Sequence, residues 1–69
     1  MLLDITASRS SRLIRLPEVI NRVGLSRSAI YKRMAEGVFP RSRSLGPKCA
    51  VWVEAEIDDW IFRISEIQR

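Results

Sequence analysis

The sequence contains no histidine and has only one cysteine, three glycines and three prolines among its 69 residues. Without a Cys/His pair there is no basis for a thiol nucleophile activated by histidine, a zinc-ligand cluster or a disulfide. Asp58 and Asp59 are adjacent, so their carboxylates cannot converge on one site from a helix. There is also no phosphate-binding glycine loop. We therefore expect no enzyme activity, no metal and no cofactor, and we expect Cys49 to be a small buried residue in a strand.

The sequence also lacks an apolar run long enough to span a bilayer, and it has no signal-peptide pattern, so we expect a cytoplasmic protein without a membrane partner. Its length suits one small domain with a marginal core. The net charge of +4 is unevenly distributed, because residues 1–53 contain ten Lys+Arg against three Asp+Glu, a balance of +7, whereas residues 54–69 contain two against five, a balance of −3. A basic segment of this kind indicates nucleic acid as the partner.

Residues 16–34 have the pattern of a helix-turn-helix. Pro17 is favoured in the first turn of a helix, which therefore begins near this residue. Gly24 can adopt the left-handed conformation that ends a helix, and the hydroxyl of Ser26 can cap the next one. The short turn between them predicts two helices packed at an angle.

The second helix is expected over residues 26–36, with Ile30 and Met34 facing inward because they lie four residues apart. Its other side carries basic and hydroxyl groups near the N-terminal half, which is the part of a recognition helix that contacts base edges in the major groove. An ordinary αα-hairpin of a small core remains the alternative. We predict that bases are read by Ser26, Arg27, Ser28, Tyr31 and Lys32.

Residues 41–53 predict a basic β-hairpin wing. Pro40 prevents the preceding helix from resuming, and two short strands flank a turn at Gly46 and Pro47. The wing is expected on the DNA backbone or in the minor groove, and the alternative is a solvated hairpin whose basic residues serve solubility. The predicted phosphate contacts, in the two helices and in the wing, are Arg22, Arg33, Arg41, Arg43 and Lys48.

The last segment, from residue 54 onward, is the clearest helix. Its apolar residues recur at the i, i+3, i+4 and i+7 positions, and its acidic start suits the helix dipole, so this start should face away from DNA. Phe62 lies off the apolar stripe; it is either a protein contact or an isolated exposed residue. The expected core consists of Leu16, Val19, Ile20, Val23, Leu25, Ile30, Met34, Trp52, Ile57, Trp60, Ile61 and Ile64.

Residues 1–12 show neither helical periodicity nor a cap, so we expect a flexible arm before a domain spanning 13–69. Arg9 or Arg12 of this arm is a candidate for additional phosphate contacts. The apolar stretch 13–16 predicts a short strand paired with the wing.

In order, the segment RLIRLPEVINRVGLSRSAIYKRMAEGVFP (12–40), the Leu45-Gly46-Pro47 turn, Val51-Trp52 and the acidic 54–60 segment closely resemble AlpA-type prophage regulators. These are small winged-helix proteins akin to the MerR-like and excisionase DNA-binding domains. The resemblance covers residues 12 to about 64 and implies an α+β, mostly helical fold, a small winged helix-turn-helix with three helices and a β-hairpin wing. One departure is Arg33, at a position that is often apolar in helix-turn-helix sequences.

The resemblance implies a sequence-specific DNA-binding regulator of phage or prophage transcription, often one that governs integration and excision genes. Two alternatives remain: an excisionase-like factor that bends DNA for an integrase, and a protein-binding inhibitory module that uses Phe62 and the acidic helix. The partners considered are double-stranded DNA, further copies of the protein on DNA, an integrase and RNA polymerase.

Overall fold

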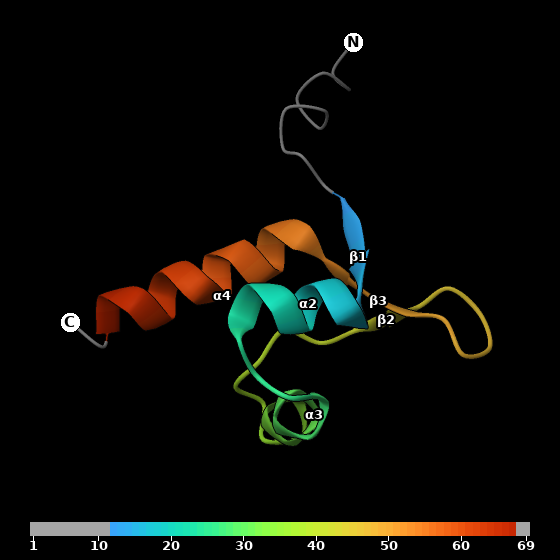
Figure 1. The fold of residues 1–69 in the computed structure, drawn as a ribbon, viewed down its shortest axis with the longest axis horizontal. Coiled ribbons are helices and arrows are strands. Elements are labelled where there is room, and N and C mark those ends of the chain that lie inside the picture. Colours follow the sequence, from blue (N-terminus) through green and yellow to red (C-terminus); the bar gives the residue numbers. More distant parts are fainter. Residues whose placement is uncertain (1–11, 68–69) are drawn as a thin grey trace, which may run out of the picture.

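The computed structural model describes residues 12–67, and this part of the chain contains three helices and a small antiparallel sheet (Figure 1). The predicted fold class, an α+β and mostly helical winged helix-turn-helix, is confirmed. The predicted arm lies outside the described residues except for Arg12. The elements in chain order are β1 (Leu13–Arg15), α2 (Leu16–Val23), α3 (Arg27–Ala35), β2 (Arg43–Ser44), β3 (Ala50–Val53) and α4 (Glu54–Ile67).

The turn between α2 and α3 is formed by local signals in the sequence. Pro17 lies in the first turn of α2, and Gly24 ends this helix with φ 72°, a left-handed conformation in which a Cβ would be strained. The Gly24 N–H donates to the Ile20 carbonyl (2.9 Å). Ser26 then accepts a hydrogen bond from the Ala29 N–H at the start of α3 (3.2 Å). Both predicted helices are confirmed within one or two residues of their expected ends.

The sheet has the strand order β1-β3-β2, with β3 paired on both sides. Ile14 of β1 lies opposite Trp52, and Arg15 lies opposite Val51. Arg43 of β2 pairs with Val51 from the other side. The expected strand before the first helix is therefore present, and it pairs with the second strand of the wing.

The hydrophobic core lies between the sheet and the three helices. Trp52 is fully buried at its centre, and its indole N–H donates to the Pro40 carbonyl (3.2 Å). Of the expected core residues, all except Ile64 are buried or pack against this core, whereas Ile64 is 36% exposed, so that prediction is wrong. Three buried residues were not predicted: Ile14, Phe39 and Val51.

Cys49 also differs from its prediction. It is half-buried and lies in the turn before β3, so it is neither a fully buried residue nor a strand residue. The reason is that β3 begins only at Ala50, because the chain before it forms the tight turn of the wing. This leaves the thiol at the edge of the hairpin.

Among residues 12–67, no helix has the length and apolar character needed to cross a membrane.

Candidate nucleic-acid interface

Helix α3 buries Ile30 and exposes polar side chains around its N-terminal half. All five predicted base-reading side chains, Ser26, Arg27, Ser28, Tyr31 and Lys32, are exposed. The Arg27 guanidinium lies 5.5 Å from the centre of the Tyr31 ring, which favours a cation–π contact. The Tyr31 ring in turn meets Trp52 edge-on, with ring centres 6.2 Å apart. The core thus supports Tyr31, and Tyr31 supports the guanidinium of Arg27.

The wing is a tight hairpin between β2 and β3. The Leu45 N–H donates to the Cys49 carbonyl (2.9 Å), and the Cys49 N–H donates to the Gly46 carbonyl (3.2 Å). Lys48 has φ 57°, a left-handed conformation that is uncommon for a residue other than glycine. The turn therefore fixes the direction in which the exposed Lys48 side chain leaves the backbone.

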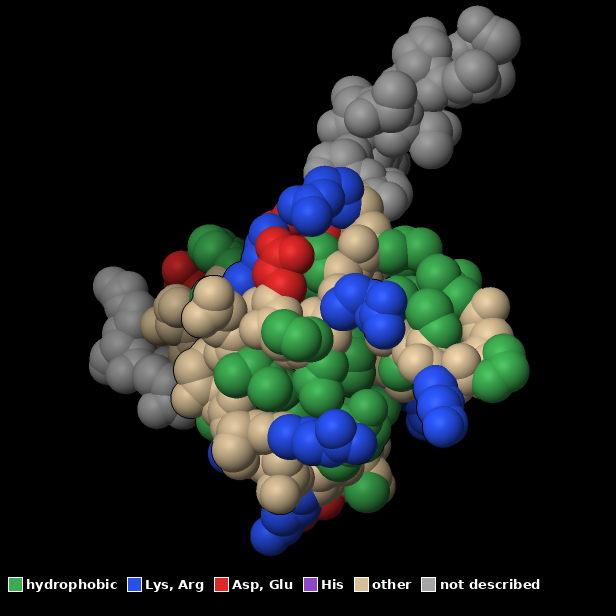
Figure 2. Space-filling view, turned by 45° about the vertical axis from the view of Figure 1, so that its right-hand side comes forward, with side chains coloured by type: hydrophobic (Ala, Val, Ile, Leu, Met, Phe, Trp, Pro, Cys, Tyr) green, Lys and Arg blue, Asp and Glu red, His purple; other side chains and the backbone are tan. Residues whose placement is uncertain are grey.

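A groove of about 550 Å³ lies between α3, the wing and β1. Arg27 and Tyr31 line it from α3, Lys48 and Cys49 from the wing, and Arg15 from β1. Figure 2 shows a face on which Lys and Arg side chains surround exposed hydrophobic atoms, whereas the acidic side chains seen there gather mainly toward the upper edge. This face has the charge expected of a surface that meets a polyanion.

The cationic side chains divide into two groups. Within the described part of the chain, one group has carboxylate partners within 4 Å: Arg12, Arg22, Lys32, Arg43 and Arg63. No carboxylate of residues 12–67 forms an ion pair with the other group: Arg15, Arg27, Arg33, Arg41 and Lys48. Only the second group is free of internal neutralisation by the described residues.

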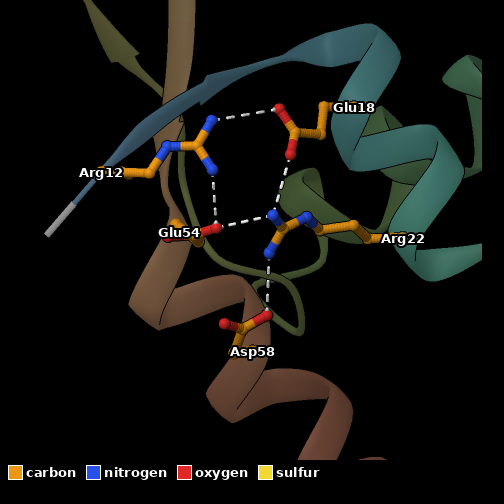
Figure 3. Close-up of polar contacts among 5 residues, drawn as sticks. All are labelled: Arg12, Glu18, Arg22, Glu54 and Asp58. Atoms are coloured by element: carbon orange, nitrogen blue, oxygen red, sulfur yellow. Dashed lines mark hydrogen bonds and ion pairs between the residues drawn. The ribbon is translucent and has the colours of Figure 1, made fainter. Parts of the chain in front are cut away.

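Arg22 lies at the centre of a network that joins α2, α4 and Arg12, the residue before β1 (Figure 3). Its guanidinium contacts Glu54 (2.6 Å) and Asp58 (3.1 Å) on α4 and Glu18 (2.8 Å) on its own helix. Arg12 also contacts Glu54 (3.1 Å). Hydrogen bonds to Glu18 and then to Glu54 raise the pKa of Arg22 above its ordinary value, because these carboxylates favour the charged guanidinium.

The network places the acidic start of α4 away from α3. Figure 1 shows α4 and α3 on opposite sides of α2, and the acids Glu54 and Asp58 face α2 through Arg22. Glu54 also donates its backbone N–H to the Arg12 carbonyl (2.7 Å). Arg22, predicted as a phosphate contact, is therefore already held by three carboxylates.

The remaining predicted phosphate contacts lie in different places. Arg43 donates two hydrogen bonds to the Glu56 carboxylate (2.8 and 3.2 Å), which raise its pKa above the ordinary value. Arg41 is exposed and lines a hollow beside Tyr31. Arg33 is half-buried and shares a hollow with Arg22 and residues of α4, so it lies on the opposite side of α3 from the wing. The structure thus brings Arg27 and Lys48 to one groove and separates Arg33 from them.

Arg15 is the cation at this groove that the sequence reasoning missed. It belongs to β1, outside both the helix-turn-helix and the wing. The expected strand over residues 13–16 contained the signal, because a strand alternates its side chains and Ile14 is the apolar residue. If Ile14 points into the core, Arg15 points outward beside the wing.

A first prediction concerns the structural role of Arg22. Replacing it with methionine leaves Glu54, whose side chain is only 12% exposed, with Arg12 as the one remaining cation of the network. We expect the thermal unfolding midpoint of Arg22→Met to fall clearly below that of the wild type, measured by circular dichroism. Arg63→Met is the matched control, because Arg63 forms an exposed pair with Asp59 one turn away, and such pairs contribute little. Equal midpoints for the two variants would contradict a structural role for Arg22.

Comparison with known proteins places these elements in one family. Residues 12–67, which include every element described above, match the family described as prophage CP4-57 regulatory protein (AlpA). The chain belongs to the AlpA family. This confirms the resemblance inferred from the sequence, and the family is one of regulatory proteins and not of enzymes.

Two relatives in the AlpA comparison are informative. The protein called DNA-binding transcriptional activator AlpA of Escherichia coli strain K12 is 41% identical over 56 residues, which cover 72% of this chain and 80% of that protein. Uncharacterized protein ORF88 of Enterobacteria phage P4 is 43% identical over 58 residues, which cover 84% of this chain and 62% of the phage protein. This AlpA-family chain thus spans less than two thirds of the phage protein. No solved structure matches the chain.

Proposed function

We propose that this AlpA-family protein binds double-stranded DNA in a sequence-specific manner and regulates the transcription of prophage genes. The observation that carries the proposal is that the match to the AlpA family covers both helices of the helix-turn-helix and the wing, and that the E. coli relative is named a DNA-binding transcriptional activator. The cations at the α3 and wing groove, which form no ion pair with a carboxylate of residues 12–67, support it.

The proposed mode of binding places α3 in the major groove, with base contacts from Ser26, Arg27, Ser28, Tyr31 and Lys32. The wing then lies on the backbone or in the minor groove. Arg22 is left out of the contact set, because a phosphate would have to compete with three carboxylates for its guanidinium. Arg43 contributes only if a phosphate replaces Glu56.

The test of this function is a footprint on prophage promoters and the neighbouring attachment region. A transcriptional regulator is expected to protect a site next to a promoter and to change transcription from it. A row of adjacent sites near the attachment region, with bending of the fragment, would instead indicate an excision factor. Absence of protection on all fragments, together with no binding to duplex DNA at low salt, would contradict the proposal.

Several copies on neighbouring sites are part of the proposal, because a single module of this size buries only about 600–1,000 Å² on DNA. Phe62 is the candidate contact between copies: its side chain is 61% exposed and lies outside the core. The spacing of protected sites in the same footprint reports whether copies lie close enough to touch.

A second prediction separates base reading from backbone contact. Arg27→Ala should cost about 1–3 kcal/mol of binding free energy on the cognate site and much less on random DNA, since a bidentate Arg–guanine contact is sequence-specific. The control is Lys48→Asn, which removes the charge and keeps a residue tolerant of the left-handed φ. Lys48→Asn should lower the affinity for cognate DNA and for random DNA by the same factor. If Arg27→Ala also lowered both affinities equally, Arg27 would be a phosphate contact.

A further inference from the structure

The groove between β1, α3 and the wing combines two chemical features. Its cationic side chains come from three separate elements, Arg15 from β1, Arg27 from α3 and Lys48 from the wing, and none of its lining residues is acidic. The lining between the cations is largely apolar. It includes Leu16, Pro17, Cys49 and Ala50.

The position of Arg15 is fixed by the sheet. Ile14 is 1% exposed and lies opposite Trp52, so the strand alternation places the exposed Arg15 on the other face, opposite Val51. The backbone of Arg15 also forms the N-cap of α2, but its side chain makes no capping hydrogen bond. Within residues 12–67 no carboxylate lies within ion-pair distance of its guanidinium. The paired strand therefore places at the groove a cation that has no ion-pair partner among residues 12–67.

We propose that this groove holds one strand of the DNA sugar–phosphate backbone, with Arg15 and Lys48 binding its phosphates from β1 and from the wing. The proposal rests on the proposed function and adds a contact outside the helix-turn-helix and the wing. An alternation of apolar deoxyribose and anionic phosphate matches an apolar lining with cations around it. Arg27, held against Tyr31, remains beside this strand for base contact.

The consequence of this arrangement is positional. Phosphate contacts set the register and orientation of a protein on the duplex, whereas base contacts specify the sequence. Arg15 lies one residue before α2, and α2 packs against α3. A phosphate held by Arg15 and Lys48 thus sets the position at which α3 enters the major groove.

The first test measures how binding of a short random-sequence duplex depends on salt. Removing one phosphate contact reduces the slope of log K against log salt by about 0.9 in magnitude. We expect this reduction for Arg15→Ala and again for Lys48→Asn, and a reduction of about twice that size for the double variant. Arg15→Lys, which keeps the charge, should retain the wild-type slope. Arg63→Ala is the matched control, an exposed arginine on α4 paired with Asp59, and should leave the slope unchanged.

The second test uses Cys49, the only cysteine of the chain, as a reporter in the groove. The thiol is half-buried beside Lys48, so a backbone strand in the groove would cover it. Saturating duplex should slow alkylation of Cys49 by iodoacetamide at least tenfold in the wild type. Inorganic phosphate at the same ionic strength should not slow it.

The outcomes separate this proposal from the proposed function. The wild type could bind duplex with a steep salt slope while Arg15→Ala had the same slope as Arg63→Ala. This result would overturn the Arg15 contact alone. An alkylation rate that saturating duplex leaves unchanged, or that phosphate slows as much as duplex does, would also overturn the groove as the backbone site. Failure of the wild type to bind any duplex at low salt would overturn both proposals.

Discussion

Replacing Trp52 with alanine is expected to remove a large part of the protein's free energy of unfolding. Trp52 is fully buried in the central strand, its indole N–H is bonded to the Pro40 carbonyl, and its ring supports Tyr31. Truncating a buried tryptophan to alanine costs about 3–5 kcal/mol. A domain this small has a total stability of about 3–10 kcal/mol, so the loss consumes a large part of it. Urea denaturation followed by circular dichroism measures the change.

Phe62→Ala is the matched control for Trp52→Ala. It also removes an aromatic ring, but from a side chain that is 61% exposed, so the free energy of unfolding should change by less than about 0.5 kcal/mol. Trp52→Phe should fall between the two, because it keeps an aromatic ring in the core and loses the bond to Pro40. If Trp52→Ala unfolded cooperatively with a urea midpoint near that of the wild type, the core would not be organised around this residue.

The second large effect is on DNA affinity as the salt concentration rises. Five cations have no carboxylate partner among residues 12–67: Arg15, Arg27, Arg33, Arg41 and Lys48. Four or five phosphate contacts, from Arg15, Arg41 and Lys48 together with Arg43 once a phosphate replaces Glu56, give a slope of log K against log salt of about −3.6 to −4.5. Between about 50 and 200 mM salt the affinity should then fall by about 10²–10³-fold, measured by fluorescence anisotropy.

The magnitude of this slope distinguishes paired from unpaired cations. Arg22→Met should retain the wild-type slope, because Arg22 is neutralised by carboxylates before DNA arrives. If the wild-type slope exceeded the Arg22→Met slope by about 0.9 in magnitude, the value for one phosphate contact, DNA would displace those carboxylates. A slope near zero would count against DNA as the ligand altogether.

The helix-turn-helix was predictable because its signals are local. Gly24 and Ser26 act on the backbone within four residues, through the bonds to Ile20 and Ala29. The exposed face of α3 follows from helical periodicity once Ile30 is placed inward. The wing was predictable for a similar reason, since a turn between two short β-forming segments leaves few alternatives.

What the sequence did not reveal depends on contacts between distant segments. The partners of Arg22 on α4 lie 32 and 36 residues away, so no local pattern reveals that carboxylates hold its guanidinium. Phe39 is buried because its ring packs edge-on against Trp60, with ring centres 4.8 Å apart, although it lies in an irregular segment. Ile64 was expected in the core but is exposed, because the apolar stripe of α4 continues beyond the part of the helix that the rest of the protein covers.

The strand order β1-β3-β2 leaves two edge strands, and each is a template on which another chain could add a strand. These edges are only three and two residues long, and each has an arginine opposite Val51, Arg15 on β1 and Arg43 on β2. Short edges with charged side chains resist the edge-to-edge pairing that starts aggregation. Arg15 and Arg43 therefore place a charge on each edge at the position where a strand of a second copy would pair.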